Sequence, residues 1–301
     1  MGYVDLPSDT GKPYRWGMLY SFCKSDGPIV KYTRDIVKAV CPTATLVIPA
    51  CDGFVHSTED EVTEVPPTFR VDYTYPDTQC IKEIETLNPD IIGVLCTRNH
   101  YDPKKILLPL DDDTFERGLK GIPDVPWDQR ISRAFWRGGI SGLPFVRKDL
   151  VTRFFNKNHT DFRFVRHYGN RELPDHLFAD PVGIDTFVKH KYIVIVDGAV
   201  ISSSHQWVFG SGSVPILITH PLNNFWFRDH LKPFVNYVPV SYSLNELETV
   251  IQWLQENDED AQRIAKNAMN LAATIFTPEF QRKYIRDEVE RVLALSARCN
   301  L

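Results

Sequence analysis

Three consecutive hydroxyls, Ser202, Ser203 and Ser204, are the side chains of this chain best suited to bind a phosphate. They follow an uncharged, mainly β-branched run at residues 192–196 and precede a short amphipathic segment at residues 205–209. If the run is a buried strand and the segment a helix, N–H groups at the helix start and the serine hydroxyls face whatever lies beyond the strand. The pattern therefore predicts a phosphate-binding loop, which includes the turn glycine Gly198.

Alternating strands and helices must position this loop, and they indicate an α/β fold. Apolar runs predict buried strands at residues 44–49, 91–96, 133–136, 162–167 and 192–196. A Gly/Ser loop at residues 138–142 and a helix from about residue 144 to 156 separate two of these strands, as in a parallel βαβ unit. In the C-terminal third, apolar residues at helical spacing predict helices with core-facing stripes at residues 247–254, 264–275 and 284–293.

The strand pattern fits two Rossmann-like halves better than a single sheet. Residues 111–128 are polar and interrupted by Gly121, Pro123 and Pro126, which is typical of a connection between domains. We therefore predict domains at residues 1–125 and 126–301.

Composition and charge exclude several classes of protein. The 301 residues are 43% hydrophobic and 24% charged, as expected of a soluble globular protein, and the net charge of -5 disfavours nucleic-acid binding. The six cysteines form no C-x-x-C pair, so a structural metal or redox motif is not expected. We find neither a signal-peptide pattern nor an apolar run long enough to span a membrane, which predicts a cytoplasmic protein without membrane insertion.

Several spaced segments together resemble glycosyltransferase family 90, seen in the Rumi-type protein O-glucosyl/O-xylosyltransferases and the fungal capsule-associated xylosyltransferases. The upstream segment is Phe135-Trp136-Arg137-Gly138, followed by Arg147 and Leu150. The downstream segments are residues 189–192, 198–202, 212–214 and 231–240, and the resemblance covers about residues 90 to 290. The chain looks like a soluble microbial or viral member of this family.

The resemblance implies a GT-B fold, with two facing Rossmann-like domains and C-terminal helices. The first domain would lie on the acceptor side, and the second would bind the nucleotide sugar. The implied reaction is an inverting, metal-independent transfer of xylose or glucose from a UDP-sugar to a hydroxyl of a glycan or protein. Xylose is favoured because the fungal capsule members and several Rumi relatives use it. UDP-xylose or UDP-glucose is then a substrate, and no cofactor or metal is expected.

Metal-free enzymes of this fold stabilise the leaving diphosphate with helix N-termini, hydroxyls and cationic side chains. The donor-binding candidates implied here are Arg137, Gly138, Gly139, Arg147, Lys191, Gly198, Ser202, Ser203 and Ser204. Rumi-type members carry an arginine at the position of Ser204, so the phosphate charge must be met elsewhere in this chain. We favour Arg147, on the helix that follows the Gly/Ser loop.

The catalytic base of Rumi-type members is expected to be an aspartate in a Tyr-His-Asp-Ile segment, four residues before a proline. The corresponding residue here is Asp102, which precedes Pro109 at a longer spacing, and Asp111 and Asp112 remain alternatives. The acidic triplet at residues 111–113 also matches an Asp-x-Asp metal clamp, but it lies in the predicted connection and not at a strand end.

A second hypothesis comes from another functional class. The missing arginine and the displaced aspartate are also compatible with a non-catalytic nucleotide- or glycan-binding module on a degenerate transferase fold. Turnover of a UDP-sugar distinguishes the two.

Overall fold

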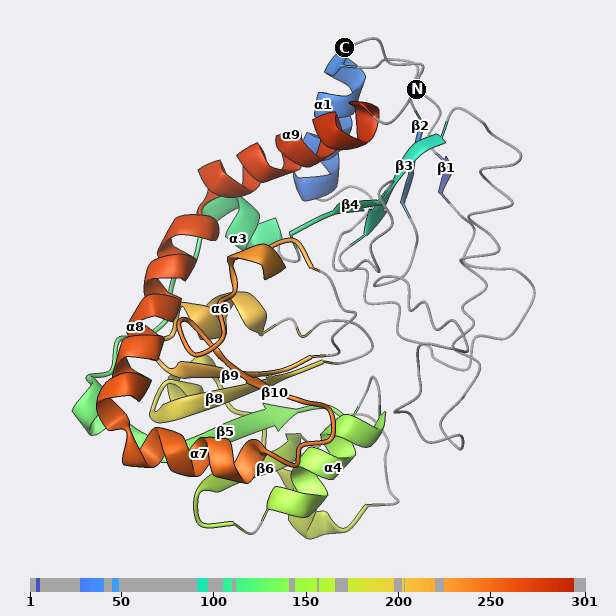
Figure 1. Ribbon diagram of the computed structural model, residues 1–301. Coiled ribbons are helices and arrows are strands. Elements are labelled where there is room, and N and C mark those ends of the chain that lie inside the picture. Colours follow the sequence, from blue (N-terminus) through green and yellow to red (C-terminus); the bar gives the residue numbers. More distant parts are fainter. Residues whose placement is uncertain are drawn as a thin grey trace. The chain divides into compact units, whose positions relative to one another are not determined.

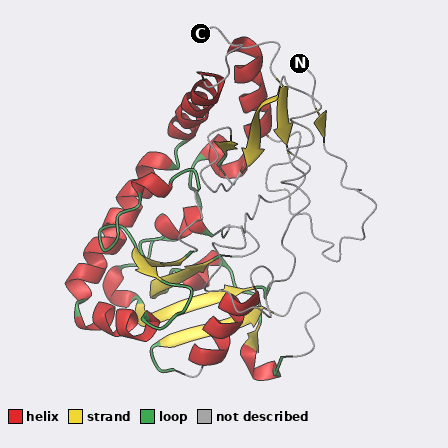
Figure 2. Ribbon diagram, turned by 45° about the vertical axis from the view of Figure 1, so that its right-hand side comes forward, coloured by secondary structure: helices red, strands yellow, loops and turns green. Residues whose placement is uncertain are grey.

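The computed structural model describes residues 4–5, 28–40, 45–48, 91–96, 105–109, 112–140, 144–155, 157–165, 173–197, 202, 204–219 and 225–294. The chain divides into two compact units. The first comprises Met1–Glu116, Leu222–Trp226 and Pro278–Leu301, and the second comprises Arg117–Pro221 and Phe227–Thr277. Figure 2 shows a separate sheet, with its strands in yellow, in each unit.

The first unit contains a parallel sheet of strands in the order β1-β2-β3-β4. These strands span Val4–Asp5, Thr45–Ile48, Ile91–Cys96 and Lys105–Leu107. Its helices are α1 (Pro28–Val40), α3 (Asp112–Arg117) and α9 (Pro278–Ala294). Helix α9 packs against α1 and β4, where buried apolar side chains such as Ile106, Phe115 and Ile285 form a core (Figure 1).

The second unit is built on a parallel sheet in the order β10-β9-β8-β5-β6-β7. The strands span Ile131–Gly138 (β5), Thr160–Val165 (β6), Phe178–Ala179 (β7), His190–Val196 (β8), Val214–Ile218 (β9) and Val238–Val240 (β10). The chain therefore starts in the middle of the sheet, builds one half through β7, and returns to build the other half from β8. This is the strand order of a dinucleotide-binding Rossmann fold.

Helices cover the second sheet, whose strands β8 and β9 are largely apolar and buried on both faces. Helices α4 (Pro144–Phe154) and α7 (Leu247–Glu256) lie on one face, and the short α6 (His205–Phe209) covers β8 and β9 on the other (Figure 1). The remaining helices are α5 (Ile184–Phe187) and α8 (Asp258–Ile275). In β8, Tyr192 to Val196 are each at most 2% exposed, as expected of a strand buried on both sides.

The α/β class and its parallel strands are confirmed, as are the apolar stripes of α7, α8 and α9, whose residues Ile251, Leu254, Ile264, Ala268, Ile275, Ile285 and Val289 are buried. The segment predicted to connect the domains, residues 111–128, contains a short helix, α3, which begins at Asp112. The contact-based units also differ from the predicted ranges 1–125 and 126–301: the first ends at Glu116, and α9 belongs to it. Within the described residues, we find no helix with the length and apolar character needed to cross a membrane.

Candidate functional site

Strands β5 and β8 are neighbours in the second sheet although β6 and β7 lie between them in the sequence. The chain leaves β5 toward one edge of the sheet and leaves β8 toward the other, so the loops beyond these strands diverge. Such a switch point opens a crevice at the carboxyl ends of the strands, where ligands of α/β sheets bind.

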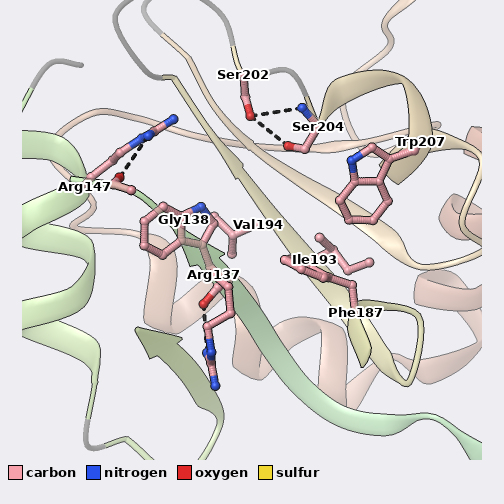
Figure 3. Close-up of a pocket in the computed structure, with 11 residues that line it drawn as sticks. Arg137, Gly138, Arg147, Phe187, Ile193, Val194, Ser202, Ser204 and Trp207 are labelled. Atoms are coloured by element: carbon pink, nitrogen blue, oxygen red, sulfur yellow. Dashed lines mark hydrogen bonds between the residues drawn. The ribbon is translucent and has the colours of Figure 1, made fainter. Parts of the chain in front are cut away.

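A pocket with a volume of about 190 Å³ lies at this switch point. Its walls come from the ends of β5 and β8, from α4, α5 and α6, and from the segment before α6. The lining residues are Trp136, Arg137, Gly138, Gly139, Arg147, Phe187, Ile193, Val194, Ser202, Ser204 and Trp207 (Figure 3). Sites for whole drug-sized ligands typically have volumes of about 300 Å³ or more, so a pocket of this size holds only part of such a ligand.

Arg147 of α4 is held at the pocket by three backbone carbonyls. Its Nε donates to the carbonyl of Asp197 at 3.0 Å, and its terminal nitrogens donate to Gly139 at 2.9 Å and Val196 at 3.2 Å. These acceptors lie just beyond β5 and at the end of β8. Burial lowers the pKa of Arg147 to about 10, and the nearby Asp197 and then Tyr242 oppose that shift. The pocket thus contains a cation whose orientation is fixed by the strand ends.

The serines form the second polar element of the pocket. The Oγ atoms of Ser202 and Ser204 are 2.7 Å apart, and the backbone N–H of Ser204 donates to Ser202 Oγ at 3.3 Å. The next residue, His205, is buried, and its Nδ1 donates to the Ser202 carbonyl at 2.5 Å. Burial lowers the pKa of His205, although the Ser202 carbonyl and Asp197 favour its charged form. The neutral ring therefore fixes the backbone that presents both hydroxyls.

The other end of the pocket is aromatic. Phe187 of α5 and Trp207 of α6 meet edge to face with their ring centroids 5.1 Å apart, and Ile193 lies beside them (Figure 3). The ring of Phe135 in β5 contacts Phe187 edge to face, with the two ring centroids 4.9 Å apart. An apolar ring of a ligand can pack here while its charged groups contact Arg147 and the serines.

Arg137 lines the pocket but is engaged in the sheet. Its Nη2 pairs with Asp161 Oδ1 at 2.8 Å, and Nη1 donates to the carbonyls of Trp136 and Asp161. Burial lowers its pKa, and Asp161 opposes this. In Figure 3 its guanidinium points away from Ser202 and Ser204. Gly138 and Gly139, by contrast, lie in the pocket wall, as predicted donor-binding residues should.

The structure does not bring Lys191 to the pocket. Lys191 lies near the start of β8, where Nζ pairs with Asp258 Oδ1 at 2.6 Å and lies 4.9 Å from the ring centroid of Trp127. At about 3.3 Å per residue, the carboxyl end of β8 at Val196 is roughly 17 Å away. The sequence already indicated this position, because Lys191 precedes the apolar run and therefore lies at the amino end of the strand. The pocket lies at the carboxyl ends of the parallel strands.

Two other segments of the family resemblance hold the loops at that amino edge. Arg130 donates from Nη1 to Ser213 Oγ at 2.7 Å and from Nη2 to the Ser211 carbonyl at 3.0 Å. The buried Asn236 accepts a hydrogen bond from the Lys232 N–H at 2.9 Å and donates to the His230 carbonyl at 3.0 Å. These contacts account for the segments at residues 212–214 and 231–240 by packing and not by ligand binding.

Some predicted site residues lie outside the described residues: Asp102, Gly198, Ser203 and Asp111. Asp113 of the acidic triplet is exposed at the start of α3. Across the described part of the chain, no cluster of three or more His, Cys, Asp or Glu side chains is arranged to hold a metal ion.

Asp197 and Tyr242 belong to the site and were not predicted. Asp197 is 1% exposed, and its Oδ2 accepts hydrogen bonds from Thr219 at 2.8 Å and Tyr242 at 2.7 Å. A carboxylate directly after a buried strand is a recognisable signal for the carboxyl edge of a sheet. The partner Tyr242 could not be found from sequence, because it follows a strand two places away in the sheet.

The fold and the pocket together define the class of this protein. A Rossmann-type unit with a cation and hydroxyls at its switch point, combined with a second α/β unit, is the GT-B fold of glycosyltransferases. The chain belongs to glycosyl transferase family 90, whose sequence model matches residues 113–292, more than half of the chain.

The curated relatives agree with this family. Protein O-glucosyltransferase 3 of Rattus norvegicus is 27% identical over 203 residues, covering 63% of this chain and 40% of the rat protein. Protein O-glucosyltransferase 2 of Danio rerio is 27% identical, covering 62% and 39%. A viral relative, protein 179R of Invertebrate iridescent virus 6, is 24% identical, covering 62% and 18%. The matches thus span less than half the length of these relatives.

Solved structures agree with the fold. Anabaena HepE in complex with UDP-glucose superimposes with a TM-score of 0.51 at 9% identity, covering 88% of this chain and 77% of HepE. Sucrose-phosphate synthase from Thermosynechococcus elongatus gives a TM-score of 0.52 at 11% identity, covering 84% and 68%. At these identities the likeness concerns the fold alone.

Proposed function

We propose that this chain transfers glucose or xylose from a UDP-sugar to a hydroxyl group of a glycan or protein acceptor. This proposal rests on the pocket at the β5–β8 switch point, where Arg147 and the hydroxyls of Ser202 and Ser204 line one cavity in a family 90 chain. An oriented cation and hydroxyl donors stabilise the negative charge that develops on a leaving diphosphate.

The placement of the donor follows from the two ends of the pocket. The diphosphate contacts Arg147, Ser202 and Ser204, and a ring of the donor packs against Phe187 and Trp207. The names of the curated relatives support glucose as the transferred sugar. The resemblance to the fungal capsule members and several Rumi relatives favours xylose. Both donors belong in the first test.

The proposed reaction is a single inverting displacement without a metal ion. A base removes the proton of the acceptor hydroxyl, whose oxygen attacks the anomeric carbon while the bond from that carbon to the diphosphate breaks. Asp102 is the base that we favour, on the family resemblance described above. The electron pair of the broken bond stays on UDP, whose charge Arg147 and the serines stabilise.

A donor-turnover assay tests this proposal. We expect slow release of UDP from UDP-glucose or UDP-xylose without acceptor, faster release with a suitable acceptor, and no loss of rate in excess EDTA. The configuration of the product at the anomeric carbon, read by NMR, tests inversion. Complete loss on chelation, restored by Mn²⁺, would overturn the metal-independent mechanism. UDP binding without turnover of either donor would instead support a non-catalytic binding module.

A further inference from the structure

Asp197 is a buried carboxylate at the carboxyl end of β8, directly beside the arginine of the pocket. Its backbone N–H continues the sheet by donating to the Ile218 carbonyl at 3.2 Å, and its own carbonyl accepts from Arg147 Nε at 3.0 Å. A buried carboxylate is costly unless hydrogen bonds and a nearby positive charge stabilise it. Asp197 has both.

Two hydroxyls fix the Asp197 side chain. Thr219 follows β9 directly, Tyr242 lies just beyond β10, and both donate to Oδ2, at 2.8 Å and 2.7 Å. Three neighbouring strands therefore each contribute one residue to this cluster. Because the sheet fixes the strand ends, the carboxylate cannot turn without breaking both hydrogen bonds.

The Asp197 carboxylate is a negative charge near Arg147. Its three hydrogen bonds go to neutral carbonyls, which orient the guanidinium but do not balance its charge. The largest influence that favours the Arg147 cation comes from the negative charge of Asp197, with a smaller one from the nearby Tyr242. An arginine has five N–H donors. Among the described residues three of those of Arg147 have acceptors, so one on each terminal nitrogen can reach a ligand.

We propose that Asp197, held by Thr219 and Tyr242, is a positioning residue that keeps Arg147 oriented toward the diphosphate of the donor. This inference rests on the proposed function, since it assigns the remaining N–H groups of Arg147 to UDP. Under this inference, the affinity for the negatively charged phosphate groups depends on the Asp197 carboxylate, which is also negative. The hydroxyls of Tyr242 and Thr219 offset part of the Asp197 charge. The gain in affinity from orienting Arg147 therefore exceeds the loss from repulsion between Asp197 and the phosphates.

Affinities for UDP and for uridine, which lacks phosphates, separate positioning from general stability. We expect Asp197→Asn to weaken UDP binding about tenfold, within the range of coupling between contacting residues. Tyr242→Phe, which keeps the carboxylate, should weaken it about threefold, as loss of one hydrogen bond does. Uridine affinity should stay within about twofold in both variants, since the nucleoside makes no contact with Arg147. In an Arg147→Ala background, Asp197→Asn should cause no further loss.

Matched controls come from residues near the amino ends of the strands of the same sheet. Asp258→Asn removes a carboxylate that pairs with Lys191, and Tyr192→Phe removes a buried hydroxyl that donates to the Leu254 carbonyl at 3.1 Å. We expect UDP affinity to be unchanged in both. Unchanged or tighter UDP binding by Asp197→Asn, an equal loss for UDP and uridine, or an additive loss in the double variant would overturn the inference alone. Lack of UDP binding by the wild-type chain would overturn the proposed function and this inference with it.

Discussion

Gly138 lies against the indole of Trp136, so that a Cβ atom at residue 138 would come within 2.6 Å of Trp136 Cζ2. Trp136 is 5% exposed and lines the pocket. The guanidinium carbon of Arg147 lies 5.8 Å from the centroid of the Trp136 ring. The absence of a side chain at residue 138 therefore lets the tryptophan and the arginine occupy their places.

We expect Gly138→Ala to displace the indole, at a cost of about 1–3 kcal/mol in the free energy of unfolding, and to weaken UDP binding. Thermal unfolding and calorimetry with UDP measure the two effects. Gly183→Ala is the matched control, because its Cβ would meet only Asp185 Oδ1, at the end of a side chain that can rotate. Wild-type UDP affinity in Gly138→Ala would show that the position of Trp136 does not matter for the donor.

Arg147→Ala should lower the affinity for UDP at least tenfold, because a charge-assisted contact to a diphosphate is worth about 1.5–3 kcal/mol. The variant also leaves three carbonyls without their donor, so we expect a loss of stability of about 1–3 kcal/mol. Arg147→Lys retains a charge but cannot bridge three carbonyls, and it should give an intermediate affinity. If folded Arg147→Ala binds UDP as the wild type does, Arg147 is not the cation that binds the diphosphate.

Lys191→Ala should leave UDP affinity unchanged, because Lys191 lies at the amino edge of the sheet. Its side chain is 12% exposed and its partner Asp258 is 48% exposed, so the ion pair is partly screened by solvent. We expect a stability loss of about 1 kcal/mol at most. Calorimetry with UDP beside denaturant titration measures both quantities, and a clear loss of UDP affinity would restore Lys191 to the donor site.

The stability of the second unit should fall as the pH drops below about 6.5, the pKa of histidine in an unfolded chain. Burial lowers the pKa of His159, His190 and His205, so the unfolded state binds protons more readily than the folded state. The stability from these neutral rings is present above pH 6.5 and is lost as the pH falls through their folded pKa values.

Each ring contributes a slope of up to about 1.4 kcal/mol per pH unit. Urea unfolding from pH 5 to 8 measures it. His205→Asn keeps a donor near the Ser202 carbonyl without a titrating ring, and its slope should be shallower than that of the wild type. An identical slope would contradict a role for His205 in acid sensitivity.

Asp102→Asn should lower kcat about 10²–10⁴-fold while the affinity for the UDP-sugar stays nearly intact, because a base contacts the acceptor and not the donor. Initial rates and UDP-sugar binding check the two halves of this statement. Asp111→Asn and Asp112→Asn are the controls. If Asp102→Asn remains active and either control abolishes activity, the base belongs to the acidic triplet.

The local pattern of this sequence was sufficient for several helices and strands, but not for β7, β10 or α5. The uncharged run at residues 192–196 predicted a strand buried on both faces, and β8 contains it. Helical spacing predicted the buried stripes of α7, α8 and α9. These features depend on neighbours in the chain, because alternation and periodicity report which side of an element is buried. Ser202 and Ser204 were found in the same way, from the end of such an element, whereas Gly138, Gly139 and Arg147 came from the resemblance to glycosyltransferase family 90.

Which of these residues share one pocket was decided only by the tertiary structure. Sheet pairing places β8 beside β5 across a long sequence separation, and this brings Arg147 to the carbonyls after both strands. The pairing of β8 with β9 and of β9 with β10 joins Asp197 to Tyr242, and the direction of β8 leaves Lys191 at the far end of that strand. Strand order and direction arise from contacts between distant segments, which no local periodicity encodes. The sequence by itself therefore determined many of the elements and, through the family resemblance, most of the chemical groups, and the order of the parallel strands decided which groups meet.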